Sequence, residues 1–540
     1  MLRNFLMLKD INILKTLKIL SLITVLFMLL PYLYILLLAL EPNSSYLDFI
    51  IKNRILNNYI YNTVELILKV GLFSIIIGFL GAYFMAFYSF RFKSIINLFF
   101  ILPLSIPIYV GAYVYSDLYH RIPFLETIFK NDFTMNSTVF IYVIFLYPYV
   151  YLTTYAYLKK HMQEYIEAGK MLRLSDFQIL YRIILPLTKT ILFSSSLFVI
   201  YESLSDFAVS EYFGVQTLSR AFNDAWRLSS DQSTSAKLAF GLVLIIGMAI
   251  SFEKFLNKKV KLDSSLLSER RLIKASMSVN IVIYTFYTLI ITIGFILPFQ
   301  RILIGALKNY EYFFKSNITG AAIQTLILSL WVILVIIIIA MFLSSMLKYL
   351  KPFSRKKLSL IATLGYMMPS MILSLGVYSL CFNLDLLINP LIKNFTSEGY
   401  ILTSTIIVLV VGMSLKFLAI AFNNFEQTYK KIHPSIFEAS LTLNQNPIKT
   451  FFKIDLYFLS KTTVFIAILV ILDVFKELTI SFTLSPFNFR TISMEIYSYM
   501  ANEMPQVAYV PSIIIIFVCM ACIIVLERGL VNDKNRKFNI

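Results

Sequence analysis

Two stretches of this chain decide its fold: residues 164–186, EYIEAGKMLRLSDFQILYRIILP, and residues 435–457, SIFEASLTLNQNPIKTFFKIDLY. The triplet Glu167-Ala168-Gly169 in the first corresponds to Glu438-Ala439-Ser440 in the second, 271 positions later, and apolar residues follow both triplets at the same spacings. The chain is therefore a fused tandem repeat.

The composition around these stretches is that of a membrane protein. Hydrophobic residues make up 58% of the 540 residues and charged residues only 14%, and the mean hydropathy is +0.76. Soluble globular proteins do not reach such values. The apolar runs are long enough to cross a hydrocarbon core of roughly 30 Å as helices, which satisfy their own backbone hydrogen bonds.

These runs predict an all-α polytopic protein with about twelve transmembrane helices, six in each half. The expected spans of the first half are 19–40, 64–90, 95–118, 139–158, 191–209 and 238–252, and those of the second half are 279–297, 321–346, 358–382, 401–422, 462–480 and 508–526. Because six spans is an even number, both halves enter the membrane from the same side, as parallel repeats do.

The basic residues predict the orientation. The net charge is +18, and most Lys and Arg lie in the loops on the side that holds both termini and both repeated stretches. By the positive-inside rule this side is the cytoplasm. Topology and anionic lipid headgroups account for the charge, so membrane lipid is an expected partner and nucleic acid is not.

The repeat also predicts the domain boundaries. Residues 1–256 form the first half, with a cytoplasmic loop at 159–189, and residues 276–540 form the second, with a cytoplasmic loop at 425–460. The polar, basic stretch 257–275 between them is the expected linker.

Nothing in the sequence points to catalysis. The phosphate-binding pattern GxxxxGK[ST] is absent, and His120, His161 and His433 belong to no cluster with metal-ligand spacing. We therefore assign no catalytic residue, no metal site and no cofactor to this chain.

Each repeated stretch predicts a helix, a tight turn and a second helix that leads into the membrane. Ser175 in the first copy, and Asn446 followed by Pro447 in the second, suit the start of that second helix. The turn contains Arg173 in one copy and Asn444 in the other, of which Asn tolerates a left-handed backbone better. An isolated stretch of this kind is an ordinary loop between spans, but two at matched places indicate a functional knob.

The two stretches resemble the EAA motif of ABC-importer permeases of the binding-protein-dependent type, and the resemblance extends over essentially the whole chain. It implies a type I importer permease, in which this cytoplasmic helix docks on a separate ATPase. The residues that it assigns to ATPase coupling are Glu167, Ala168, Gly169, Arg173, Glu438, Ala439, Ser440 and Asn444.

The chain departs from the family pattern at three positions. The family usually has Gly where this chain has Arg173 and Asn444, and Tyr457 stands where the first copy keeps the family's Pro186. These departures concern the geometry of the turn and leave the expected fold unchanged.

A narrower resemblance concerns the transported solute. Residues 202–207, ESLSDF, with 212–218, YFGVQTL, and residues 476–478, KEL, with 485–491, SPFNFRT, are similar to stretches of fused ferric-iron permeases. Permeases for thiamine, phosphonates and polyamines share parts of this pattern, so these solutes remain alternatives.

Four carboxylates stand in register within or near the spans. Glu202 and Asp473 lie 35 residues after Glu167 and Glu438, and Asp206 and Glu477 lie 39 residues after them. A separation of four places each pair one turn apart on a helix. Ionisable groups in a span are costly and usually face a bundle interior or a wet path, so we expect these four to line or gate the translocation pathway. Holding helices together, with Lys476 as an ion partner, is the alternative.

The resemblance implies the partners. Two copies of a cytoplasmic ABC ATPase use ATP below one copy of this chain, and a periplasmic or extracellular solute-binding protein delivers the solute above it. The chain itself would lie in the bacterial cytoplasmic (inner) membrane as a multi-pass protein with both termini cytoplasmic. A self-powered secondary transporter and a membrane scaffold or receptor without solute flux are the rival classes.

Overall fold

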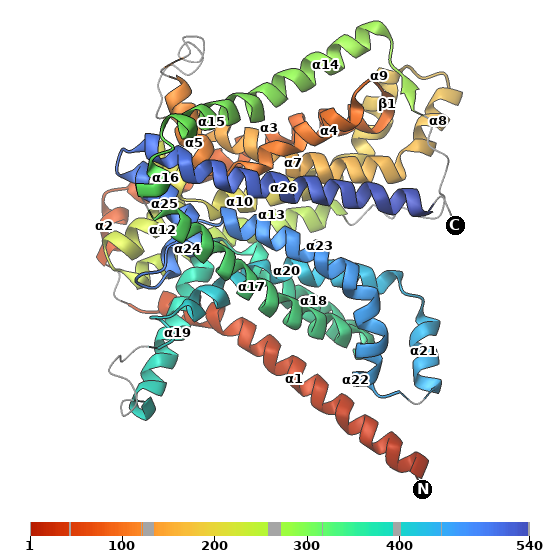
Figure 1. The fold of residues 1–540 in the computed structure, drawn as a ribbon, viewed down its shortest axis with the longest axis vertical. Coiled ribbons are helices and arrows are strands. Elements are labelled where there is room, and N and C mark those ends of the chain that lie inside the picture. The colour runs from red at the N-terminus through yellow and green to blue at the C-terminus, as the bar shows by residue number, and fades with distance from the viewer. Residues whose placement is uncertain are drawn as a thin grey trace. The chain divides into compact units, whose positions relative to one another are not determined.

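The computed structural model describes residues 2–42, 45–119, 121, 134–257, 272–315, 317–392, 401–443 and 445–537. Almost all of these residues are helical (Figure 1). The two strands, β1 (Tyr88–Ser89) and β2 (Ile273–Lys274), form one short parallel pair. The all-α prediction is therefore confirmed.

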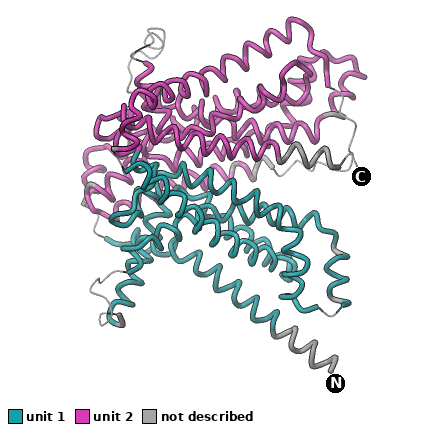
Figure 2. The backbone as a smooth tube through the Cα atoms, viewed as in Figure 1, with its two compact units in different colours: residues 1–42, 317–495 teal, residues 43–316, 496–540 magenta. Residues whose placement is uncertain are grey.

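The chain divides into two compact units, coloured separately in Figure 2. Unit 1 comprises residues 1–42 and 317–495, and unit 2 comprises residues 43–316 and 496–540. The first helix of the chain belongs to the first half but packs in unit 1, which holds most of the second half. Residues 276–316 and the last helix belong to the second half but pack in unit 2, which holds most of the first half. The compact units and the sequence repeat divide the chain at different places.

Unit 2 holds the spans of the first repeat except the first, together with residues 276–316 and the last helix from the second repeat. Its elements are α2 (Ser45–Lys52), α3 (Ile55–Phe87), α4 (Lys93–Ile101), η1 (Leu102–Ser105), α5 (Ile108–Tyr119), α7 (Met135–His161), α8 (Gln163–Met171), α9 (Asp176–Ile179), η2 (Leu180–Ile184), α10 (Leu185–Ser205), α11 (Ala208–Tyr212), α12 (Leu218–Asn223), η3 (Asp224–Leu228), α13 (Gln232–Asn257), α14 (Met277–Ile291), η4 (Thr292–Ile296), α15 (Leu297–Lys308), α16 (Tyr312–Lys315) and α26 (Pro505–Lys537).

Unit 1 holds the remaining spans of the second repeat, together with the first helix of the chain. Its elements are α1 (Leu2–Ala39), α17 (Ile318–Met346), η5 (Leu347–Tyr349), α18 (Pro352–Met367), α19 (Ser370–Ile392), α20 (Ile406–Lys431), α21 (Pro434–Thr442), α22 (Pro447–Thr450), η6 (Phe451–Asp455), α23 (Leu456–Lys476) and α24 (Thr479–Leu484). Helix α25 (Ile492–Ala501) contains the boundary between the two units.

Among the described residues, 11 helices are long and apolar enough to cross a membrane, or up to 12 if one bent pair counts as a span. The bent pair, Lys93–Ser105 and Ile108–Tyr119, is the predicted third span, and it turns by 95° just before Pro107. The predicted ninth span is likewise broken before Pro369, between α18 and α19. Proline lacks a backbone donor and restricts the residue before it, so the breaks have a local cause.

Each unit has a tightly packed core. In unit 2, α3 crosses α7 so closely that a Cβ on Gly78 would come within 2.7 Å of Val150, and a Cβ on Gly81 would come within 2.5 Å of Phe100 on α4. In unit 1, a Cβ on Gly365 of α18 would approach the backbone oxygen of Leu415 to 1.9 Å. Small residues let helix backbones approach closely where lipid provides no hydrophobic driving force.

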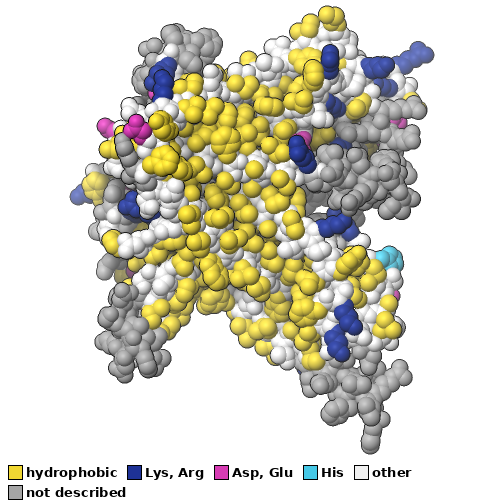
Figure 3. Space-filling model, viewed as in Figure 1, with side chains coloured by type: hydrophobic (Ala, Val, Ile, Leu, Met, Phe, Trp, Pro, Cys, Tyr) yellow, Lys and Arg dark blue, Asp and Glu magenta, His cyan; other side chains and the backbone are white. Residues whose placement is uncertain are grey.

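The outside of the helices is apolar. Leu37, Leu68 and Ile338 on three different helices are each at least 60% exposed. Figure 3 shows hydrophobic side chains over most of the visible face, with Lys and Arg mostly near its ends. Exposed apolar side chains on helices of this length suit contact with the hydrocarbon core of a bilayer.

From the fourth span of each half to the end of the fifth, the second half repeats the first at a constant offset of 271 residues. Helices α7, α8, α9, η2 and α10 begin at residues 135, 163, 176, 180 and 185, and α20, α21, α22, η6 and α23 begin at 406, 434, 447, 451 and 456. Two different sequences thus fold into the same succession of elements without an insertion or deletion.

Candidate functional site

The first knob consists of α8, a tight turn and the start of α9. The Arg173 N–H donates to the Lys170 carbonyl at 2.9 Å, and the Leu174 N–H donates to the Gly169 carbonyl at 3.1 Å. These two bonds form a Schellman motif, in which the residue after the helix adopts a left-handed backbone. That residue is Arg173, with φ of 56°. The predicted tight turn is therefore confirmed, and a non-glycine residue is held in a conformation that favours glycine.

A capping box starts the second helix of this knob. The Ser175 hydroxyl accepts a hydrogen bond from the Gln178 N–H, and the Gln178 side chain accepts one from the Ser175 N–H. The expected N-cap at Ser175 is confirmed. Reciprocal bonds of this kind satisfy two backbone donors that have no partner within the helix.

The second knob, α21 to α22, reaches the same geometry with different residues. The Gln445 N–H donates to the Ser440 carbonyl at 3.1 Å, which matches the bond from Leu174 to Gly169. The Asn446 side chain accepts from the Lys449 N–H at 2.7 Å, with Pro447 at the first helical position. This confirms the predicted cap, whereas Asn444 lies outside the described residues.

The small residues of the two triplets point in different directions. Ala168 and Ala439 are exposed, while Gly169 and Ser440 are buried. A Cβ on Gly169 would lie 3.0 Å from both Ile179 and Ile183. The second position of each triplet is thus open to a partner, and the third is small because it packs against the chain's own next helix.

In the second copy this internal contact is polar. The hydroxyls of Ser440 and Thr450 lie 2.7 Å apart, and Thr450 stands where the first copy has Ile179. The two acidic residues before the alanines also differ, because Glu438 is exposed whereas Glu167 is half-buried.

The knobs carry exposed apolar residues that the sequence analysis missed. Leu172 and Leu443, which are equivalent, are 73% and 72% exposed. Two further equivalent pairs are also exposed: Phe177 with Ile448, and Tyr181 with Phe452. Apolar patches this open usually mark an interface with another protein or a membrane. Comparing the apolar character of the two copies position by position would have found them in the sequence.

Each knob continues into one long helical run. Residues 176–205 and 447–476 are single spans of 30 residues, each with a π-helical turn at the same place, η2 and η6. At 1.5 Å per residue such a run is about 45 Å long. In each half, the knob thus lies at one end of a continuous helical segment, and the carboxylates lie at its other end.

Asp206 lies at the far end of the first run. Helix α10 ends at Ser205, and the Asp206 N–H still donates to the Glu202 carbonyl at 3.2 Å, so the two residues are one turn apart as predicted. The Asp206 carboxylate accepts from the backbone N–H groups of Ala208 and Val209, both at 3.2 Å. It also accepts from the Tyr142 hydroxyl at 2.9 Å. Asp206 therefore caps the next helix, α11.

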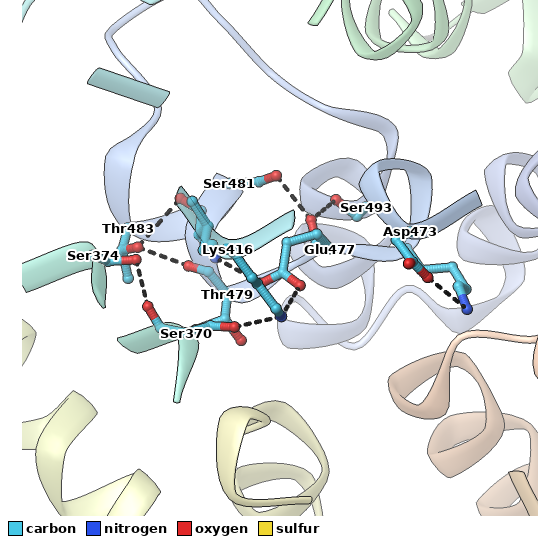
Figure 4. A network of polar contacts seen from close by, with 11 residues as sticks. Ser370, Ser374, Lys416, Asp473, Glu477, Thr479, Ser481, Thr483 and Ser493 are labelled. Carbon is cyan, nitrogen blue, oxygen red and sulfur yellow. Dashed lines mark hydrogen bonds and ion pairs between the residues drawn. The ribbon is translucent and has the colours of Figure 1, made fainter. Parts of the chain in front are cut away.

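Glu477 occupies the corresponding place in the second run (Figure 4). Its carboxylate accepts from the Ile480 N–H at 3.2 Å, which is the position of Val209 in the first copy. It also pairs with Lys416 of α20 at 2.6 Å. The two side chains are only 10% and 4% exposed, so the ion pair is buried.

The Lys416 ammonium also donates to the Ser370 hydroxyl at 2.6 Å. Ser370 is the first residue of α19, at the break in the predicted ninth span. The Lys416 side chain therefore links this break to Glu477 at the end of α23. The first half has the apolar Phe145 at the position of Lys416. Lys476, which the alternative interpretation gave as an ion partner for these carboxylates, pairs with Asp473 at 3.7 Å.

A further pair of matched bonds confirms the repeat beyond these helices. The Thr63 hydroxyl of α3 accepts from the Leu218 N–H at 2.8 Å, and the Thr325 hydroxyl of α17 accepts from the Ile492 N–H at 2.9 Å. Thr63 and Thr325 are 262 positions apart. Helices α3 and α17 are therefore equivalent at this offset. Among the described residues, no three His, Cys, Asp or Glu side chains are grouped so that they could hold a metal ion.

One region of the chain matches a known family of transport proteins. Residues 74–262 match the model of the binding-protein-dependent transport system inner membrane component. This chain is an inner membrane component of such a transport system. The matched region contains the first knob, Glu202 and Asp206, and the repeat supplies the second copy outside it.

A curated relative extends over nearly the whole permease. The Fe(3+)-transport system permease protein FbpB 2 of Haemophilus influenzae is 21% identical over 481 residues, which cover 88% of this chain and 90% of that protein. Our chain is thus the multi-pass permease of an ABC importer and not the subunit that hydrolyses ATP. Permeases of this family work with a binding protein and an ATPase.

Proposed function

We propose that this permease forms the whole transmembrane part of an ATP-driven importer that carries ferric iron into the cytoplasm. One copy would serve per transporter, because the fused halves supply two knobs for two copies of the ATPase. Both termini and both knobs would face the cytoplasm of a bacterial inner membrane, and a binding protein would deliver the iron at the opposite face.

The matched pair of knobs carries this proposal. An ATPase surface that binds one knob can bind the other in the same way, because both knobs have a matched bond that closes the turn and a matched N-cap. Ala168 and Ala439 with the exposed pair Leu172 and Leu443 offer a small apolar contact to each ATPase copy. The exposed Glu438 adds a carboxylate for a basic group, and Glu167 stands at the same position in the first knob.

The long helical runs connect ATP hydrolysis to the pathway. Closure of the ATPase pair would displace the knobs, and a continuous helix of about 45 Å transmits displacement at one end to the other. The bound nucleotide and the loaded binding protein must both prefer the outward-open state, since a ligand shifts an equilibrium only through its different affinity for two states.

The proposed pathway residues are Glu202, Asp206, Asp473 and Glu477. Two of them, Asp206 and Glu477, also cap the helices that follow, so a change of helix position would move their charge. Because Lys416 neutralises Glu477, the two halves would present unequal negative charge to a cation. Changing all four carboxylates to amides, together with Lys416→Met so that no buried charge loses its partner, should lower transport while assembly stays normal. Unchanged transport in the assembled variant would remove the pathway role.

The assignment to iron rests on the relative from Haemophilus influenzae, together with the similarity of residues 202–207, 212–218, 476–478 and 485–491 to ferric-iron permeases. Thiamine, phosphonates and polyamines are the competing solutes. Uptake into proteoliposomes that contain the permease, its ATPase and its binding protein tests them directly. We expect ATP-dependent uptake of ferric iron that excess thiamine does not inhibit. Uptake without any ATPase would instead indicate a secondary transporter.

A further inference from the structure

Unit 1 contains a cavity of about 290 Å³ beside the second knob. Helix α1 contributes Leu17 to its wall, α17 contributes Met341, Ser345 and Met346, and the start of the α22 run contributes Phe451 and Asp455. The volume is close to the lower end of ordinary ligand pockets, which is about 300 Å³. Apart from Ser345 and Asp455, these walls are apolar.

Asp455 contributes a carboxylate to the cavity wall, and one of its oxygens lacks a hydrogen bond of full geometry. The side chain is completely buried, and its Oδ2 pairs with the Lys348 ammonium at 2.5 Å. Its Oδ1 has no partner with full hydrogen-bond geometry among the described residues, and the Tyr429 hydroxyl lies close enough to interact with the same carboxylate. A buried oxygen of this kind costs free energy unless it accepts a hydrogen bond. A ligand that donates a hydroxyl would satisfy it.

The equivalent place in the first half is filled by large side chains. At the offset of 262 residues, Met341, Ser345 and Met346 correspond to Phe79, Tyr83 and Phe84. The Tyr83 ring lies 6.3 Å from that of Phe79 and 5.7 Å from that of Phe84. At the offset of 271, Asp455 corresponds to the buried Ile184. The cavity and its carboxylate are thus features of the second half, where smaller side chains replace aromatic ones.

Basic residues lie close in sequence to residues that line this cavity. Lys15 and Lys18 flank Leu17 on α1, and Lys449 and Lys453 are exposed on the run that carries Phe451 and Asp455. These residues belong to the ends of spans that the charge distribution places at the cytoplasmic side. Basic residues near an anionic leaflet are attracted to its headgroups.

We propose that the cavity holds an anionic phospholipid of the cytoplasmic leaflet that has a free headgroup hydroxyl, as phosphatidylglycerol does. One acyl chain lies against Met341 and Met346, and the phosphate lies near the lysines. A headgroup hydroxyl donates to Asp455. Because the cavity adjoins the α22 run, the bound lipid supports the joint between the second knob and its membrane helix. This proposal does not depend on the transported solute.

Native mass spectrometry of the full chain tests the proposal. The chain is released from nanodiscs that contain equal parts of phosphatidylglycerol, phosphatidylethanolamine and phosphatidylcholine. We expect the wild type to retain phosphatidylglycerol in preference to the other two lipids. Ser345→Tyr, which introduces the residue of the first half, should lower this retention at least tenfold. Met341→Phe is a second filling variant that tests the same point if Ser345→Tyr does not fold.

The control is Leu334→Tyr, which adds the same aromatic side chain to a half-exposed position of α17 outside the cavity. It should retain lipid as the wild type does. Lys15→Gln with Lys18→Gln should reduce the preference for phosphatidylglycerol over phosphatidylethanolamine. Undiminished retention in both filling variants would overturn the site, and equal retention of phosphatidylcholine would overturn the headgroup assignment.

Discussion

The buried pair of Lys416 and Glu477 gives the sharpest test of how the second half is held together. Lys416→Met keeps the length of the side chain and removes its charge. The Glu477 carboxylate, whose side chain is only 10% exposed, would then lose its cation. Removing one partner of a buried ion pair typically costs about 3–5 kcal/mol, because the remaining charge stays desolvated.

The double variant Lys416→Met with Glu477→Gln should recover most of this loss. The amide oxygen can still accept from the Ile480 N–H, which keeps the cap of α24, and no charge is left without a partner. Replacing both members of a buried pair is often close to neutral. We therefore expect the double variant to be more stable than Lys416→Met alone by about 2–4 kcal/mol.

Equilibrium unfolding of the purified chain in detergent, followed by circular dichroism, measures these free energies. The matched control is Phe145→Met, which places the same side chain at the equivalent position of the first half and changes only volume, at a cost below about 1.5 kcal/mol. If Lys416→Met unfolds within about 1 kcal/mol of the wild type, or if the double variant is no better than the single one, the structural role of the pair is wrong.

Two further predictions concern local geometry. Arg173→Gly should slow hydrogen exchange in residues 163–184, because glycine removes the cost of a left-handed backbone, about 1 kcal/mol. Arg173→Ala keeps the Cβ and should not slow the exchange. Faster exchange in the glycine variant would contradict the left-handed turn. At the start of α13, burial opposes ionisation of Asp231, but hydrogen bonds from the Thr234 N–H and hydroxyl and from the Tyr46 N–H outweigh it, so the pKa of Asp231 lies below its usual value. Because the folded pKa is the lower one, its stabilisation is present above the unfolded pKa of about 3.9 and is lost as pH falls through the folded value. Thermal unfolding at several pH values should show Asp231→Asn below the wild type at pH 7 and level with it in strong acid; a constant difference would refute this cause.

Local chemistry made the knobs predictable from sequence. Ser175, and Asn446 with Pro447, are caps whose preference depends only on their own backbone, and both lie where the spacing placed them. The break before Pro107 also has a local cause, and so does the one before Pro369.

Contacts between distant residues were not predictable. Lys416 lies in an apolar run with nothing near it in sequence to indicate Glu477 or Ser370, because these residues come from three separate helices. The packing of α1 with helices of the second repeat left no local signal either. The different environments of the residues within each triplet could not be predicted from the sequence either. Only the position of α9 shows that Gly169 is buried while Ala168 is exposed.

Crosslinking at the knobs tests the central claim most directly. Cysteine at position 168 or 439, Ala168→Cys or Ala439→Cys, places a reactive group on the exposed residue of each triplet in native membranes. We predict that both positions capture an ATPase subunit and that adding ATP changes the yield at both. Cysteine at Leu37, on the exposed face of α1, is the control and should capture none. If neither knob captures a nucleotide-hydrolysing partner, this chain is not driven in the way we describe.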